Sequence, residues 1–217
     1  MLVTIDGPAA SGKTSVSREI ANRLGWNWVS TGAFYRGIAF LALKFKVGLS
    51  DEHALVDLVG EKNWKVFMSP ERTQFILDDE DVTDQIYLEE IGSAASKISH
   101  HPRLRESLLQ AQRNCLNSVS ALVAEGRDCG TVVFPEAPVK IYLTAKSDHR
   151  AARRAKEEGA SLEKTLSAQK ERDKQDTSRS AAPLQVPEKA HVVDTSEMDL
   201  QQVVDRIDQI IKSELNL

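Results

Sequence analysis

The 217-residue sequence has only two cysteines, Cys115 and Cys129. This scarcity excludes a disulfide framework, and the absence of a CxxC pair removes a common zinc-binding pattern, so a reducing compartment fits best. No stretch reaches the roughly 18 uninterrupted apolar residues that a membrane span needs. The first residues also lack the basic and apolar regions of a secretory signal. We therefore expect a cytoplasmic protein with no membrane partner.

The sequence also lacks a large excess of charge of either sign. Its 28 basic and 32 acidic side chains leave a net charge of −4, which argues against a general nucleic-acid-binding protein. Basic residues nevertheless gather between Arg150 and Arg179, and such a segment suits a small polyanionic ligand better than a long phosphate backbone. The alternative interpretation is a solvated, charged helix. We expect a monomer with no nucleic-acid partner.

No repeat or low-complexity segment interrupts the chain, and strand patterns alternate with helix patterns. Short runs rich in β-forming residues predict strands at 2–5, 26–29, 121–125, 139–144 and 191–194. Helical spacing of apolar residues fills most of the chain between these runs. This alternation predicts the α/β class, with a parallel sheet covered by helices on both faces. The segment 64–77 differs, because two alternating runs around Pro70 predict an inserted antiparallel hairpin.

One motif carries specific chemistry. Residues 7–14 fit the pattern GxxxxGK[ST] in every defined position, and they stand between a predicted strand and a predicted helix. In such a loop, glycines allow backbone N–H groups to surround phosphate oxygens at a helix N-terminus. Lys13 then supplies a positive charge to the β- and γ-phosphates, and Thr14 supplies a hydroxyl ligand for Mg²⁺. The residues predicted to hold a nucleoside triphosphate such as ATP are Gly7, Pro8, Ala9, Ala10, Ser11, Gly12, Lys13, Thr14 and Ser15.

A phosphate-binding loop alone fits GTPases, ATPases and kinases. The absence of NKxD, and of DxxG at the expected place, weighs against a GTPase, and the small size with a basic segment favours a kinase of small molecules. Further arginines stand beside a glycine, a helix start or an acidic residue, at Arg36, Arg105, Arg127 and Arg179. Because the planar guanidinium group binds phosphate oxygens in pairs, these arginines indicate a site for a second phosphate.

The chain also resembles the bacterial cytidylate kinases. The resemblance runs nearly from end to end, through TIDGPAASGKT, STGAFYR, EDVTD, AASKISHHPRLRESLLQAQR, EGRDCGTVVFPEAPVKIYL and KERDKQDTSRSAAPL. It implies one P-loop kinase domain over 1–217, with a five-stranded parallel sheet flanked by helices. It also implies an acceptor-binding insert with a small antiparallel sheet near 60–100, and a short helical lid near 150–178. The implied reaction moves the γ-phosphoryl group of ATP, with Mg²⁺, to CMP or dCMP.

The same resemblance implies roles for residues that match the family's motifs. The positions that contact the cytosine edge are matched by Ser96, Arg105 and Asp128. The positions that hold the ribose are matched by Asp176 and Arg179. The positions around the acceptor phosphate are matched by Thr31, Arg36 and Arg127.

Transfer between two phosphates needs alignment and neutralisation of charge more than a general base, since the acceptor oxygen is already ionised. The residues expected to neutralise charge are Lys13, Arg150, Arg154 and Arg172, whereas Arg153 is interpreted as a surface charge. Glu125, at the end of a predicted strand, either orients Mg²⁺ or is a structural carboxylate. Two rival interpretations stay open: a P-loop kinase for another acceptor such as shikimate, and a regulatory protein that binds ATP without transferring phosphate.

Overall fold

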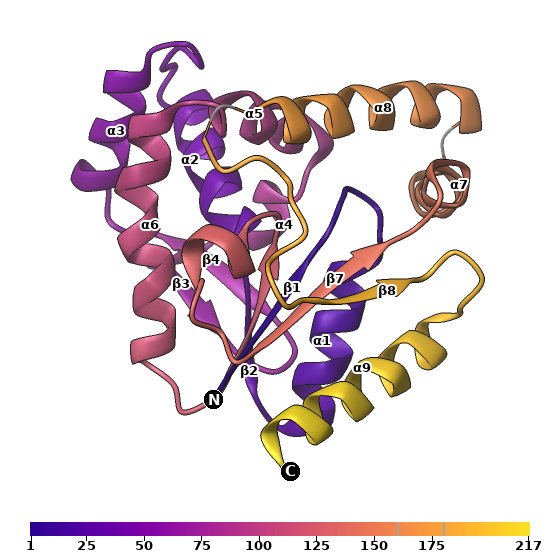
Figure 1. Ribbon diagram of the computed structural model, residues 1–217. Helices are drawn as coiled ribbons and strands as arrows, with labels where there is room; N and C mark the ends of the chain where they lie inside the picture. Colours follow the sequence, from indigo (N-terminus) through magenta and orange to yellow (C-terminus); the bar gives the residue numbers. More distant parts are fainter. Residues whose placement is uncertain (160, 180) are drawn as a thin grey trace.

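The computed structural model of the protein describes residues 1–159, 161–179 and 181–217, with every side chain in these ranges except those of residues 157, 158 and 172. In the described part, five strands form a parallel sheet in the order β2-β6-β1-β7-β8 (Figure 1). They are β1 (Leu2–Asp6), β2 (Asn27–Ser30), β6 (Leu122–Gly126), β7 (Val139–Thr144) and β8 (His191–Asp194). The α/β class and the five-stranded parallel sheet predicted from the sequence are confirmed.

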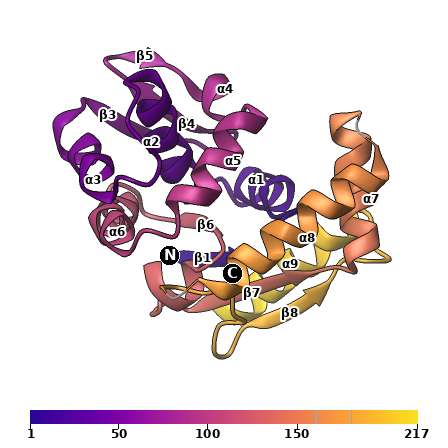
Figure 2. The same ribbon diagram turned by 90° about the horizontal axis from the view of Figure 1, so that it is seen from above.

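Helices surround this sheet. Along the described chain they are α1 (Lys13–Leu24), α2 (Gly32–Lys44), α3 (Glu52–Glu61), α4 (Thr83–Ile86), α5 (Glu89–Ile98), α6 (Pro102–Asn117), a short π-helix η1 (Cys129–Val133), α7 (Ser147–Glu158), α8 (Leu162–Ser178) and α9 (Leu200–Leu215). None of the described helices is long and apolar enough to cross a membrane. Seen from above, α2 to α6 gather on one side of the molecule and α7 stands on the other, and α8 runs from α7 toward α5 (Figure 2).

The two faces of the sheet bury separate apolar clusters, because side chains alternate along a strand. Val3 and Ile5 of β1 belong to the cluster that α1 and α9 cover. Leu122 and Ala124 of β6 point the opposite way, into the larger cluster under α2, α5 and α6. Neighbouring positions on one strand therefore face opposite layers of helices. The carboxyl ends of the strands all lie at one edge, where the phosphate-binding loop also begins.

A small antiparallel sheet packs beside α2. It consists of β3 (Trp64–Met68), β4 (Thr73–Leu77) and β5 (Glu80–Asp81). The Trp64 ring stacks on Phe75 with centroids 5.5 Å apart, and Phe75 lies so close to Gly37 that a Cβ atom there would be 2.0 Å from the ring. The predicted hairpin is confirmed. The two-residue β5 and the one-turn α4 were not predicted, because elements this short carry no periodic pattern.

Candidate active site

The phosphate-binding loop joins β1 to α1 through backbone that few residues tolerate. Gly12 stands immediately before α1 with a φ of 88°, in the left-handed region that glycine adopts without strain. At Gly7 a Cβ atom would lie 2.2 Å from the carbonyl oxygen of Leu143, so no larger residue fits. Lys13 and Thr14 then begin α1, at the helix end whose N–H groups attract anions. The backbone of the loop thus requires both glycines of the motif.

Lys13 is buried at the head of α1. Its Nζ donates to the carbonyl oxygen of Pro8 (2.6 Å) and to Ser11 Oγ (3.4 Å), both within the loop. Burial, followed by the charge of Arg127, lowers the pKa of Lys13 to about 7, against the opposing effect of Glu125. A bound triphosphate would add negative charge around this amine and so favour its protonated form.

Thr14 and Glu125 meet at the end of β6. Thr14 Oγ1 donates to Glu125 Oε1 at 3.1 Å, and Thr31 Oγ1 donates to the backbone oxygen of Glu125 at 3.0 Å. Of the two interpretations of Glu125, this contact favours the one in which its carboxylate faces the Mg²⁺ position. A hydroxyl and a carboxylate beside a phosphate loop fit Mg²⁺, which prefers oxygen ligands and usually binds substrate phosphates as well.

A single cavity of about 440 Å³ opens beside this loop. Lys13, Thr14 and Glu125 form part of its wall. The same wall includes every residue that the sequence assigned to the acceptor: Thr31, Arg36, Ser96, Arg105, Arg127, Asp128, Asp176 and Arg179. These residues come from segments far apart in the sequence, so their convergence depends on the fold. Their individual roles stay predictions.

In the cavity wall, Arg105 and Asp128 form a buried ion pair through Arg105 Nη2 and Asp128 Oδ2. The Arg105 guanidinium also lies over the ring of Tyr35, 5.4 Å from its centroid, and donates to the carbonyl oxygen of Ser99. Ser96 Oγ donates to Gln175 of α8 at 2.9 Å, which ties α5 to α8. The cavity wall therefore includes a carboxylate, a guanidinium group and a hydroxyl that a bound ligand can contact.

A second ion-pair cluster links β6 to the end of α8. Arg127 Nε donates to Asp176 Oδ2 at 2.7 Å, and Arg179 Nη2 lies 3.3 Å from Asp176 Oδ1. Burial opposes ionisation of Asp176, yet Arg127 and Arg179 together hold its pKa below the ordinary value. The carboxylate is therefore ionised at neutral pH, and it keeps both guanidinium groups at the cavity wall.

The four arginines of α7 and α8 lie in different surroundings. Arg150 is buried away from the cavity wall: it donates to the carbonyl oxygen of Ala9 at 2.9 Å and forms an ion pair with Asp173 at 2.6 Å. Arg153 and Arg154 both belong to the cavity wall, but the guanidinium group of Arg153 donates to Thr195 Oγ1 at 3.0 Å, so its interpretation as a structural surface charge stays open. The side chain of Arg172 lies outside the described part of the chain.

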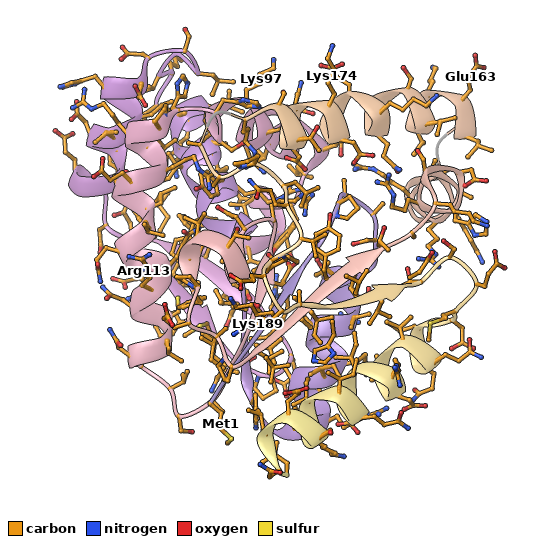
Figure 3. All side chains as sticks on the ribbon, in the orientation of Figure 1. Met1, Lys97, Arg113, Glu163, Lys174 and Lys189 are labelled. Carbon is orange, nitrogen blue, oxygen red and sulfur yellow. The ribbon has the colours of Figure 1, made fainter. Side chains whose placement is uncertain are left out.

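Arg150 therefore anchors the phosphate loop to α8 rather than pointing at the cavity, and a direct catalytic role for it stays a prediction. Arg154 pairs with Glu89 of α5 at 2.8 Å, which places one more contact between α7 and α5. Other basic and acidic residues of this region point outward from α8, as Figure 3 shows for Lys174 and Glu163. The locally basic segment thus combines solvated charges with cavity residues.

Sequence patterns missed three residues near the site, Asp6, Tyr35 and Tyr87. Tyr35 and Tyr87 line the cavity; the motif STGAFYR contains Tyr35 without giving it a role, and only its position after folding identifies Tyr87. Asp6 is fully buried, and its two carboxylate oxygens accept the N–H groups of Cys129 (2.8 Å) and Gly130 (2.7 Å) at the start of η1. Burial raises the pKa of Asp6 to about 6 even though both hydrogen bonds lower it. An acidic residue directly before the motif was its one sequence signal.

Comparison with known proteins agrees with this geometry. The model of the cytidylate kinase family matches residues 3–213. The chain belongs to the cytidylate kinase family. It is 57% identical over 215 residues to a cytidylate kinase of Bdellovibrio bacteriovorus, covering 99% of each chain. It is 40% identical over 219 residues to a cytidylate kinase of Klebsiella pneumoniae, covering 99% of this chain and 96% of that relative.

The resemblance drawn from the motifs is thus confirmed, and membership implies a kinase that takes ATP and a nucleotide acceptor. Solved structures support the fold alone. A gluconokinase of Sinorhizobium meliloti gives a TM-score of 0.53 at 16% identity, covering 99% of this chain and 93% of that one. An uncharacterized protein of Eubacterium ventriosum gives a TM-score of 0.57 at 13% identity, covering 98% and 99%. At such identities, the likeness shows a shared architecture and says nothing about the acceptor.

Proposed function

We propose that this chain transfers the γ-phosphoryl group of ATP to CMP and dCMP, forming ADP together with CDP or dCDP. One observation carries the proposal: a single cavity joins Lys13 of the phosphate loop to the buried pair of Arg105 and Asp128. The loop suits the phosphates of the donor, and the ion pair suits the base of the acceptor. Membership of the cytidylate kinase family supports the same pairing of substrates.

Recognition of cytosine follows from the chemistry of its edge. Cytosine presents an amine donor beside two acceptors, N3 and O2. A carboxylate at Asp128 accepts from the amine, whereas the guanidinium of Arg105 and the hydroxyl of Ser96 donate to the acceptors. Uracil has an oxygen and an N–H group at the first two of these positions, so buried groups would lose partners at about 1–3 kcal/mol each. With two such positions, we therefore expect CMP to be preferred to UMP by about 30-fold or more.

The transfer itself depends on alignment and on neutralisation of charge. Arg36 and Arg127 bind the acceptor phosphate and bring its oxygen in line with the γ-phosphorus atom. The ammonium group of Lys13 neutralises negative charge on the β- and γ-phosphates during transfer, and Arg154 supplies further positive charge from α7. Mg²⁺ held beside Thr14 and Glu125 would neutralise the phosphates of the donor. No residue needs to act as a general base, because the acceptor oxygen is already ionised.

A coupled assay of nucleoside diphosphate formation tests the proposal. The acceptors are CMP, dCMP, UMP, AMP, GMP, dTMP and shikimate, each with ATP and Mg²⁺. We expect robust turnover of CMP and dCMP, weaker turnover of UMP and little of the rest. Robust turnover of AMP or shikimate with none of CMP would reject the acceptor. Tight binding of ATP without formation of CDP would favour the rival interpretation, a regulatory protein that binds nucleotide.

Asp128→Ala separates the two substrate sites within this assay. We expect kcat/KM for CMP to fall strongly while the Kd for ATP stays close to that of the unaltered chain. Equal damage to ATP binding would place Asp128 in the donor site. Four further expectations keep the status of predictions: the cytoplasmic location, the monomeric state, the acceptor-binding insert near 60–100 and the lid near 150–178.

A further inference from the structure

Tyr87 follows α4 directly and faces the part of the cavity that Arg36 occupies. Its ring centroid lies 5.2 Å from the central carbon of the Arg36 guanidinium group, in a cation–π contact. Both residues belong to the wall of the same cavity. No motif of the sequence includes Tyr87, and the function described above does not use it.

The segment around Tyr87 also holds Arg36 through its backbone. Arg36 Nη1 donates to the carbonyl oxygen of Ile86 at 3.0 Å and to that of Leu88 at 3.5 Å. Across the guanidinium group, Gly92 leaves room that a side chain would remove, since a Cβ atom there would lie 2.9 Å from Arg36 Nη2. Carbonyl groups on either side of Tyr87, its ring and Gly92 therefore fix the plane of the guanidinium group.

The hydroxyl of Tyr87 forms a hydrogen bond with the side chain of Ser30. Tyr87 is 41% exposed and thus open to the cavity, yet the surrounding protein and the nearby charge of Glu125 raise the pKa of its phenol, while Arg36 and the Ser30 side chain lower it to a smaller extent. The phenol is therefore neutral at physiological pH and able to donate its proton in a hydrogen bond. Ser30 ends β2, so the hydroxyl lies at the same sheet edge as Thr31 and Glu125.

We propose that Tyr87 is a further acceptor-binding residue, whose hydroxyl donates to the acceptor phosphate and whose ring orients Arg36 toward that phosphate. The inference rests on the proposed function, because it needs a phosphorylated acceptor in this part of the cavity. It assigns the two halves of the side chain separate effects. Loss of the hydroxyl should weaken only the direct hydrogen bond, and loss of the ring should also release Arg36.

Two substitutions separate these effects in steady-state assays. Tyr87→Phe keeps the ring, and we expect the KM for CMP to rise about tenfold, as for one lost hydrogen bond to a charged group. Tyr87→Leu should raise that KM further and lower kcat, because Arg36 is no longer aligned. The KM for ATP should change less than twofold in both variants. Phe67→Leu is the matched control, since Phe67 is an exposed aromatic residue of β3 outside the cavity wall.

Binding of cytidine provides the readout that a merely structural role would not give. Cytidine keeps the base and ribose of CMP but lacks the phosphate, so its Kd should stay the same in Tyr87→Phe while the Kd of CMP rises. Equal losses for cytidine and CMP, or a KM for CMP unchanged in both variants, would overturn the inference while leaving the proposed function standing. Failure of the unaltered chain to form CDP would overturn the proposed function, and this inference with it.

Discussion

Replacing Arg105 with methionine keeps the apolar stem of the side chain but removes the charge that balances Asp128. The two side chains are only 8% and 7% exposed, so water cannot replace the lost interaction. Removing one partner of a buried ion pair costs about 3–5 kcal/mol. Asp128 would also be left near Asp6, a second buried carboxylate whose pKa it already raises. We therefore expect Arg105→Met to lower the free energy of unfolding by about 4–5 kcal/mol.

Asp128→Asn is the matched variant, and its cost should be smaller. The charge of Arg105 would still contact the carbonyl oxygen of Ser99 and the face of Tyr35. We expect a loss of about 1–3 kcal/mol, as for a weakened buried hydrogen bond. In the double variant neither charge is left alone. Its loss in the free energy of unfolding should therefore be about 2 kcal/mol smaller than the sum of the losses in the two single variants.

Urea unfolding, followed by circular dichroism and by tryptophan fluorescence, gives these free energies. An unchanged m value shows that the variants expose the same surface on unfolding and can be compared. Equal costs for the two single variants, or a double variant whose cost is their sum, would refute the reasoning that these charges compensate each other next to Asp6.

Three further predictions concern titration and the metal. Lys13, with a pKa of about 7, should take up close to one proton when ATP binds at pH 8. Calorimetry in buffers of different ionisation enthalpy should record this proton uptake. The variant Lys13→Ala should lose the uptake together with most of kcat. No proton uptake by the unaltered chain would contradict this. The pKa of Asp6, raised to about 6, means that the folded chain holds this proton more tightly than the unfolded chain does. Unfolding free energy, measured in urea, should therefore fall relative to Asp6→Asn as the pH rises from about 4 to about 6, and a constant difference would refute the shift. Glu125→Gln should raise the Mg²⁺ concentration needed for half-maximal activity by about tenfold, whereas an unchanged Mg²⁺ titration would make Glu125 a structural carboxylate.

The sequence predicted the features that depend on contiguous residues. The phosphate loop could be recognised because its glycines and Lys13 follow one another within a single strand–turn–helix unit. The hairpin at 64–77 could be recognised because alternation and Pro70 are both local signals. Strand positions were correct to within about two residues, the usual uncertainty of element ends.

Features that depend on distant contacts were not visible in this way. The segment Cys129-Gly130-Thr131-Val132-Val133 contains β-branched residues typical of a strand, yet it forms η1. The carboxylate of Asp6 accepts the first two N–H groups of η1. Because Asp6 lies more than a hundred positions away, a local sequence pattern cannot predict this contact. Arg150 and Arg153 are similar by sequence, but a shift of three positions on α7 buries one against Asp173 and ties the other to Thr195, just after β8.

Direct transfer inside one cavity is the central claim, and ATP with a radioactive γ-phosphoryl group tests it. The chain is incubated with this ATP, CMP and Mg²⁺, and the nucleotides and the protein are then separated. We expect label to appear in CDP at the rate at which ADP forms, with none retained on the protein. Label that appears only as inorganic phosphate, or that stays in bound ATP while CMP is present, would contradict the account.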